Sequence, residues 1–193
     1  MIKERFYKTI DFFYKKNYSI YSAKKLAQIF FDAGYYMESE EYASKAFNES
    51  DTDPKDRHGH GTHVAGIISG DGTLKGAAPN SQLYIYKALN EDGSGLLRWI
   101  ISSIDASLDP NQDGNLSDHV DIISMSLGVD CGGIYDSFCG PDDALITAVN
   151  NAVNEGVVVV VAAGNSGPYE NTITSPGTAE KAITVGASDF NDG

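Results

Sequence analysis

The sequence is short of basic residues and has no long apolar run, and each shortage excludes a class of protein. Only 14 of its 193 residues are Lys or Arg, against 27 that are Asp or Glu, so the formal net charge is −13. Nucleic-acid binding needs a basic face that neutralises phosphates, which argues against DNA or RNA as a partner. No apolar stretch reaches the roughly 18–20 residues of a membrane-spanning helix, so we expect no membrane span.

The sequence also holds only two cysteines, Cys131 and Cys139, close together in a glycine-containing loop. We expect a disulfide between them if the protein is secreted, and two free thiols in a reducing compartment. The first 18 residues carry basic side chains but lack the continuous apolar segment of a signal peptide. Residues 1–22 are therefore expected to form a separate helical segment whose role stays open.

What the sequence does contain is a candidate general base in a tight backbone setting. The run His60–Gly66 reads His-Gly-Thr-His-Val-Ala-Gly, and small apolar residues continue it as the start of a helix. Histidine can accept and return a proton near neutral pH, so a histidine at an exposed helix start suits acid–base catalysis. The alternative is a pair of metal-binding or solvated histidines, but no third ligand follows at a matching spacing.

Alternating strands and helices predict the fold class. The unbroken valine run Val157–Val161 is typical of a strand buried on both faces of a parallel sheet. Strands and helices in alternation imply an α/β fold, a doubly wound parallel sheet with helices on both faces. The expected helices span residues 60–69, 96–108 and 143–154, and the expected strands span residues 83–88, 120–127, 157–161 and 182–187.

Taken together, these motifs resemble the subtilisin family of serine proteases from about Ala46 to Gly193, several motifs in order at compatible distances. The resemblance implies a serine endopeptidase with an Asp/His/Ser triad. His60 matches the family's catalytic histidine, and His63 is then a neighbour without a role as base. Asn165, just past the valine strand, matches the side-chain donor to the oxyanion.

The resemblance also implies a binding groove for extended peptide or protein substrates. A substrate would lie as the middle strand between two segments of the enzyme, and pockets would select its side chains. Small residues in one pocket wall predict room for a large apolar side chain before the scissile bond. The matching strand residues are Gly93, Ser94 and Gly95 on one side and Ser126, Leu127 and Gly128 on the other, and the wall residues are Ala162, Ala163 and Gly164.

The triad acid is less clearly marked. Asp32, in Ile29–Gly34, is the nearest match to the family's Asp-Thr-Gly or Asp-Ser-Gly motif, and an acid there would fix the histidine tautomer. The alternative is a helical hairpin, because apolar residues around Asp32 also fall at helical spacing and Gly34 would break the helix. Asp56, four residues before His60, is expected to lie in an exposed loop and is a weak candidate for the acid.

The family's Gly-Thr-Ser-Met-Ala segment, which carries the nucleophilic serine, does not occur in this sequence. We therefore expect residues 23–193 to be the amino-terminal portion of a peptidase domain, inactive without the rest. The alternatives are a non-catalytic relative that binds peptides, or an adaptor that works through its helical front half. The resemblance places the protein outside the cell; it says nothing about the oligomeric state.

An Asp/Asn-rich loop before the strand at 120–127 suggests a structural calcium ion. Oxygen-bearing side chains on alternate residues, closed by a glycine, follow the opening of an EF-hand loop, although no Glu stands at the twelfth position. The alternative is a solvated polar turn. The candidate ligands are Asp109, Asn111, Asp113, Asn115 and Asp118.

Overall fold

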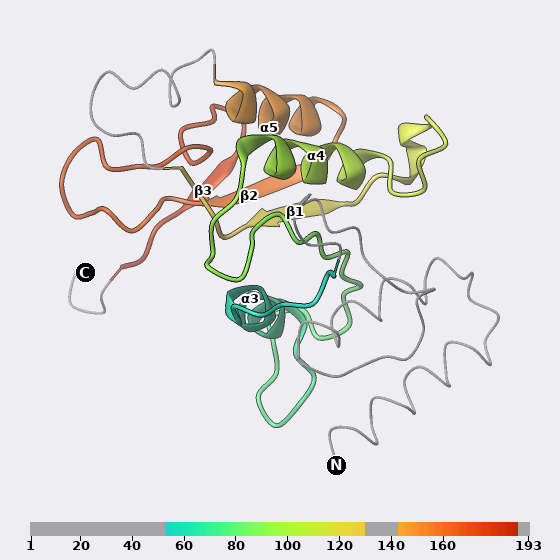
Figure 1. Ribbon diagram of the computed structural model, residues 1–193, viewed down its shortest axis with the longest axis horizontal. Coiled ribbons are helices and arrows are strands. Elements are labelled where there is room, and N and C mark those ends of the chain that lie inside the picture. Colours follow the sequence, from blue (N-terminus) through green and yellow to red (C-terminus); the bar gives the residue numbers. More distant parts are fainter. Residues whose placement is uncertain (1–52, 130–142, 189–193) are drawn as a thin grey trace. The chain divides into compact units, whose positions relative to one another are not determined.

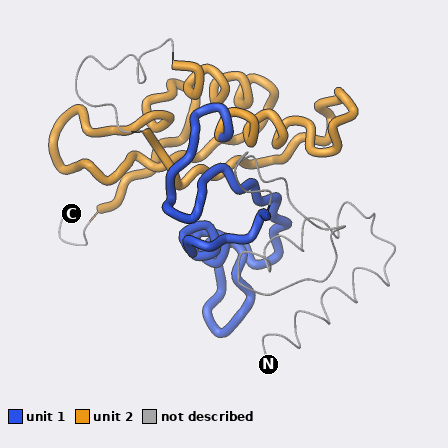
Figure 2. Tube along the Cα trace, viewed as in Figure 1, with its two compact units in different colours: residues 1–99 blue, residues 100–193 orange. Residues whose placement is uncertain are grey.

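The computed structural model describes residues 53–129 and 143–188 (Figure 1). Asp32, Cys131, Cys139 and the expected boundary at residue 22 lie outside the described residues. The chain divides into two compact units, residues 1–99 and 100–193, and each is considered separately (Figure 2). Within the described ranges, no helix is long and apolar enough to cross a membrane.

In the first unit, helix α3 (His60–Ser69) forms where the sequence predicts it. Ala65 and Ser69 are its buried residues, so only a narrow side of this short helix faces the core. The helix ends at Gly70, whose N–H donates to the carbonyl of Gly66 at 3.0 Å. A Cβ atom on Gly70 would lie 2.6 Å from that same oxygen, so the helix can end this tightly only at a glycine.

The expected strand at 83–88 is not formed within the described part of the chain. Tyr84 and Tyr86 nevertheless stack their rings in parallel planes, with centroids 6.5 Å apart. Side chains two residues apart share one side of an extended chain, so the alternation that suggested a strand is present. The prediction was wrong because alternation shows an extended segment, whereas a strand also needs a partner along the segment.

The second unit contains a parallel sheet, which confirms the predicted α/β class. Its strand order is β1-β2-β3, and both pairs of neighbours run parallel. Ile122 pairs with Val158, and Val160 pairs with Ile183. The elements of this part of the chain are α4 (Leu97–Leu108), the 3₁₀ helix η2 (Leu116–Asp118), β1 (Ile122–Met125), α5 (Ala144–Asn154), β2 (Val158–Ala162) and β3 (Ile183–Val185).

One face of this sheet is buried and the other is open. Helix α5 packs on β2, and Leu145 and Val149 of α5 have no exposed surface (Figure 1). Val159 and Val161 are buried as well, whereas Val158 between α5 and β2 is 45% exposed. The valine run was expected to be buried on both faces, and this prediction was wrong for the described part of the chain. A homogeneous valine run marks a good strand former, and what covers each face is decided elsewhere in the sequence.

The exposed face is itself apolar. Its exposed residues come from all three strands and are Ile122, Val158, Ile183 and Val185, with exposed fractions between 45% and 60%. Ile123 and Met125 of β1 point the other way and are buried. The alternation along each strand therefore follows the pleat, with apolar residues on both sides.

A buried polar contact ties α5 to the segment after β2. Asp143 accepts a hydrogen bond from the N–H of Leu145 at 2.8 Å and so caps α5. Its second carboxylate oxygen accepts the hydroxyl of Ser175 at 2.5 Å, and both residues are buried. Ser175 in turn pairs with Val129 through two backbone hydrogen bonds, of 2.8 and 3.2 Å. One carboxylate thus fixes the start of α5 and the backbone that follows β1.

We predict that Asp143→Ala lowers the free energy of unfolding by about 2–4 kcal/mol. The substitution removes a helix cap and leaves the buried Ser175 hydroxyl without its acceptor. Asp143→Asn keeps an oxygen for Leu145 and should cost less. Asp105→Ala, at an exposed position of α4, is the control and should change stability by no more than about 0.5 kcal/mol. Urea unfolding followed by circular dichroism measures all three, and equal losses for Asp143→Ala and Asp105→Ala would contradict the prediction.

Candidate active site

His60 is exposed and is the first residue of α3. The residue before it, Gly59, has a left-handed backbone with φ of 92°, which turns the chain into the helix. The ring of His58 meets the ring of His60 edge-on, with centroids 6.3 Å apart. The predicted base thus stands at an exposed helix start, beside a second imidazole that the sequence had assigned only to a polar loop.

Asp56 fixes this helix start. Its carboxylate accepts hydrogen bonds from the N–H groups of His58, Gly59 and Thr62 at 2.7–2.9 Å, and from the Thr62 hydroxyl at 2.7 Å. Burial alone would raise the pKa of Asp56, but the bonds from Gly59, Thr62 and His58 outweigh it and lower that pKa. The interpretation as a merely exposed loop was therefore wrong for Asp56, which is half-buried and caps α3.

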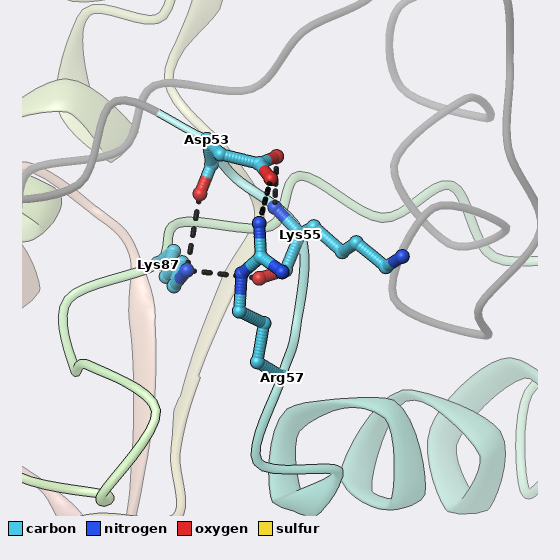
Figure 3. A network of polar contacts seen from close by, with 4 residues as sticks. All are labelled: Asp53, Lys55, Arg57 and Lys87. Carbon is cyan, nitrogen blue, oxygen red and sulfur yellow. Dashed lines mark hydrogen bonds and ion pairs between the residues drawn. The ribbon is translucent and has the colours of Figure 1, made fainter.

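A second set of contacts holds the segment that leads to α3. The ammonium group of Lys87 donates to the backbone carbonyls of Asp53 at 3.0 Å and Lys55 at 2.8 Å (Figure 3). Arg57 adds an ion pair to the carboxylate of Asp53 at 2.6 Å. That pair is largely exposed and contributes little, whereas Lys87 joins two segments more than 30 residues apart.

The predicted substrate segment of the first unit lies in a tight turn. The side-chain oxygen of Asn90 accepts the N–H groups of Asp92 and Ser94, and the backbone of Asn90 exchanges further bonds with Gly93 and Ser94. A Cβ atom on Gly93 would lie 3.1 Å from the His58 ring. The structure therefore brings Gly93 and His58 into contact, and His58 next to His60, all within one unit. Their closeness could not be read from sequence spacing.

The second unit gathers the other predicted site residues at one edge of the sheet. Residues 126–128 follow β1 and residues 163–165 follow β2, and the two strands are parallel neighbours. Their carboxyl ends therefore share an edge, where α/β proteins bind ligands. Asn165 is exposed there, after Gly164 with φ of 104°. The predicted oxyanion donor and two predicted substrate segments thus belong to one edge.

The Asp/Asn-rich loop turns its own oxygens toward its backbone. Asp109 accepts from the N–H groups of Asp113 and Gly114 at 3.1 and 2.9 Å, and Asn111, Asp113 and Asn115 each accept from an N–H two residues on. Among the residues that the structure covers, no three His, Cys, Asp or Glu side chains are grouped to hold a metal ion. One oxygen of Asp118 is buried without a hydrogen-bond partner. That single oxygen is the feature that fits a cation.

Comparison with known proteins decides the family. The Subtilase family profile matches residues 15–192. The chain belongs to the subtilase family. It is 47% identical over 146 residues to the serine protease AprX of Bacillus subtilis (strain 168), which covers 73% of this chain and 32% of AprX. It is 40% identical over 136 residues to a subtilisin of Bacillus sp. (strain TA39), which covers 68% of this chain and 30% of that subtilisin.

A solved structure agrees with this assignment. Sphericase superposes with a TM-score of 0.60 at 36% sequence identity, over 72% of this chain and 44% of the Sphericase chain. The predicted subtilisin-like α/β fold is therefore confirmed. This subtilase chain spans about a third of the length of AprX and of the Bacillus subtilisin.

We predict that Asp56→Ala costs this subtilase about 1 kcal/mol of stability at neutral pH, because it removes the cap of α3. The folded-state pKa of Asp56 lies below its ordinary value of 3.8, so the carboxylate's contribution is complete above that value and is lost as the pH falls through the folded-state pKa. Denaturant unfolding at pH 7 and below pH 3 measures it.

The matched control is Asp71→Ala, because Asp71 is exposed and pairs only with Lys75 on the surface. This control should change stability by no more than about 0.5 kcal/mol at either pH. A difference between wild type and Asp56→Ala that is the same at both pH values would contradict the role of the ionised carboxylate.

Proposed function

We propose that this chain is part of a subtilisin-type serine endopeptidase, with His60 as general base and Asn165 as oxyanion donor. One observation carries the proposal: β1 and β2 end side by side, so that Ser126–Gly128 and Ala162–Asn165 share one edge of the sheet. Membership of the subtilase family supports it. The nucleophilic serine is a residue outside this sequence, and the chain alone is inactive.

Each proposed group has a distinct task in acyl transfer. The imidazole of His60 takes the proton of the serine hydroxyl as that oxygen attacks the carbonyl carbon, and later returns it to the leaving amine. The side-chain amide of Asn165 donates a hydrogen bond to the oxyanion that develops on the former carbonyl oxygen. Loss of one such donor, measured in a subtilisin, lowers kcat by about 10²–10³. Asp32 is the proposed acid that holds the tautomer of His60 and stabilises the imidazolium.

The proposed substrate is an extended peptide or protein segment outside the cell. It would pair as a strand with Gly93–Gly95 on one side and Ser126–Gly128 on the other, so backbone hydrogen bonds would bind any sequence. The tight turn around Asn90 and the pairing of Val129 with Ser175 support this role, since each holds its segment in a fixed conformation.

A second candidate is a peptide-binding subtilase relative without catalysis. The sequence favours it in one respect, because no Gly-Thr-Ser-Met-Ala segment occurs in the 193 residues. Such a protein would keep the substrate strands and need no nucleophile. It would bind extended peptides and leave them intact.

We also propose that the loop of residues 109–118 binds a structural calcium ion. Support comes from the alternating oxygen-bearing side chains and from the buried, unpartnered oxygen of Asp118. Carboxylate and amide oxygens are the ligands that calcium prefers. The ion would stabilise a surface loop and would take no part in peptide hydrolysis.

The test of the protease proposal is active-site labelling of the full-length protein that carries this sequence. We predict that a fluorophosphonate probe labels it, that His60→Ala abolishes peptide hydrolysis, and that Asn165→Ala lowers kcat by about 10²–10³ with little change in KM. His119→Ala, at a histidine outside the motif, is the control and should keep wild-type kcat.

Two outcomes of this experiment contradict parts of the proposal. Peptide binding without labelling or hydrolysis would favour the non-catalytic candidate. Full activity in Asp32→Asn would remove Asp32 as the triad acid, because the wrong tautomer of the histidine should cost several orders of magnitude in kcat.

Calcium binding predicts a metal-dependent melting temperature. A ligand that binds only the folded protein at 100 times its Kd adds about 2.7 kcal/mol of stability, so EDTA should lower Tm by several degrees. Asp118→Asn should reduce this difference, and Glu180→Gln, at an exposed position, should preserve it. An unchanged Tm of the full-length protein in EDTA would contradict the calcium proposal.

A further inference from the structure

The side chain of Thr174 lies directly behind both predicted walls of the substrate site. A Cβ atom built on Gly128 would lie 2.5 Å from the Thr174 hydroxyl oxygen. A Cβ atom built on Gly164 would lie 2.8 Å from the same oxygen and from the Thr174 methyl group. Both walls are therefore glycine where they meet Thr174, because only hydrogen fits against this side chain.

Thr174 is held firmly in this place by its backbone. Its N–H donates to the carbonyl of Ala163 at 3.0 Å, and Ala163 donates in turn to Val185 of β3 at 2.9 Å. The next residue, Ser175, is fully buried, pairs with Val129 and donates to Asp143. The segment thus joins the ends of β1 and β2, and its side chain has little freedom to move away.

The hydroxyl of Thr174 has no role in holding the fold. Thr174 is 94% buried, with 6% of its surface exposed, and its hydroxyl makes no hydrogen bond with any residue in the described ranges. A buried hydroxyl without a partner costs stability, so such a group usually has another use. The neighbouring Ser175 shows the contrast, because its buried hydroxyl is paired with Asp143.

We propose that Thr174 determines which side chain is accepted immediately before the scissile bond. This inference rests on the proposed protease function. The small residues of Ala162–Gly164 predict a roomy pocket for a large apolar side chain, but Thr174 occupies the space behind Gly128 and Gly164. The site then favours compact side chains over aromatic ones. The free hydroxyl adds a preference for a polar end, as in glutamine, over an apolar end of similar length, as in methionine.

The physical argument has two separable parts. The volume of Thr174 excludes a ring that would have to enter the space its branched side chain fills, since packed atoms yield little. Its hydroxyl offers one donor and two acceptor positions to a polar substrate atom. A site with an unpaired polar group discriminates against substrates that leave it unpaired. Removing volume and removing the hydroxyl should therefore change different preferences.

The experiment measures kcat/KM of the full-length protein on peptides that differ only in the residue before the scissile bond, namely Phe, Leu, Met and Gln. Thr174→Gly removes the side chain and should raise the Phe/Leu ratio at least about tenfold. Thr174→Val keeps the volume and removes the hydroxyl. It should leave the Phe/Leu ratio within about twofold and lower the Gln/Met ratio several-fold. Each ratio comes from one enzyme preparation, so a loss of folded protein cancels.

Thr178→Gly and Thr178→Val are the matched controls, because Thr178 is an exposed threonine four residues further along the same segment. Both ratios should stay at wild-type values in these variants. An unchanged Phe/Leu ratio in Thr174→Gly, with the enzyme labelled and active, overturns this inference and leaves the protease proposal standing. Absence of labelling and of hydrolysis for every peptide overturns the protease proposal, and this inference with it.

Discussion

The parallel pairing of β1 with β2 is the constraint on which the second unit depends. Its register sets Ile122 beside Val158 and Met125 beside Val161, so the chain leaves both strands at the same edge. Any slip by one residue would turn the buried valines of β2 outward and separate the segments that follow. The pairing of Val129 with Ser175 then continues this order beyond the strands. Stability and the predicted substrate edge thus rest on the same backbone contacts.

The first unit solves a different problem, since it presents one histidine at an exposed helix start. A helix start leaves several N–H groups without partners, and Asp56 satisfies those of His58, Gly59 and Thr62. The side chain of His60 is thereby left unencumbered by capping. Lys87 binds the segment before the helix by its backbone carbonyls, so this anchor is independent of side-chain identity at positions 53 and 55.

Much of the fold could be predicted from the sequence because its signals are local. Helix α5 begins one residue after the predicted cap Asp143, and α3 and α4 lie within one residue of their expected bounds. The expected strand at 83–88 failed because pairing is a property of two segments. The open apolar face of the sheet could not be predicted either, since the valine run describes one strand and not its cover.

The candidate site divides along the same line. His60 and Asn165 were found from motifs, and both are exposed, His60 at a helix start and Asn165 after a strand end. The capping role of Asp56, the contact of His58 with Gly93 and the position of Thr174 depend on side chains that approach from other segments. No spacing rule contains that information. A crystal structure of the full-length protein with a bound peptide aldehyde tests the central claim most directly, that His60 and Asn165 serve one reaction. The account predicts the hemiacetal oxygen about 3 Å from the side-chain nitrogen of Asn165, with the ring of His60 facing the same adduct. An adduct that one of these two residues does not approach would contradict it.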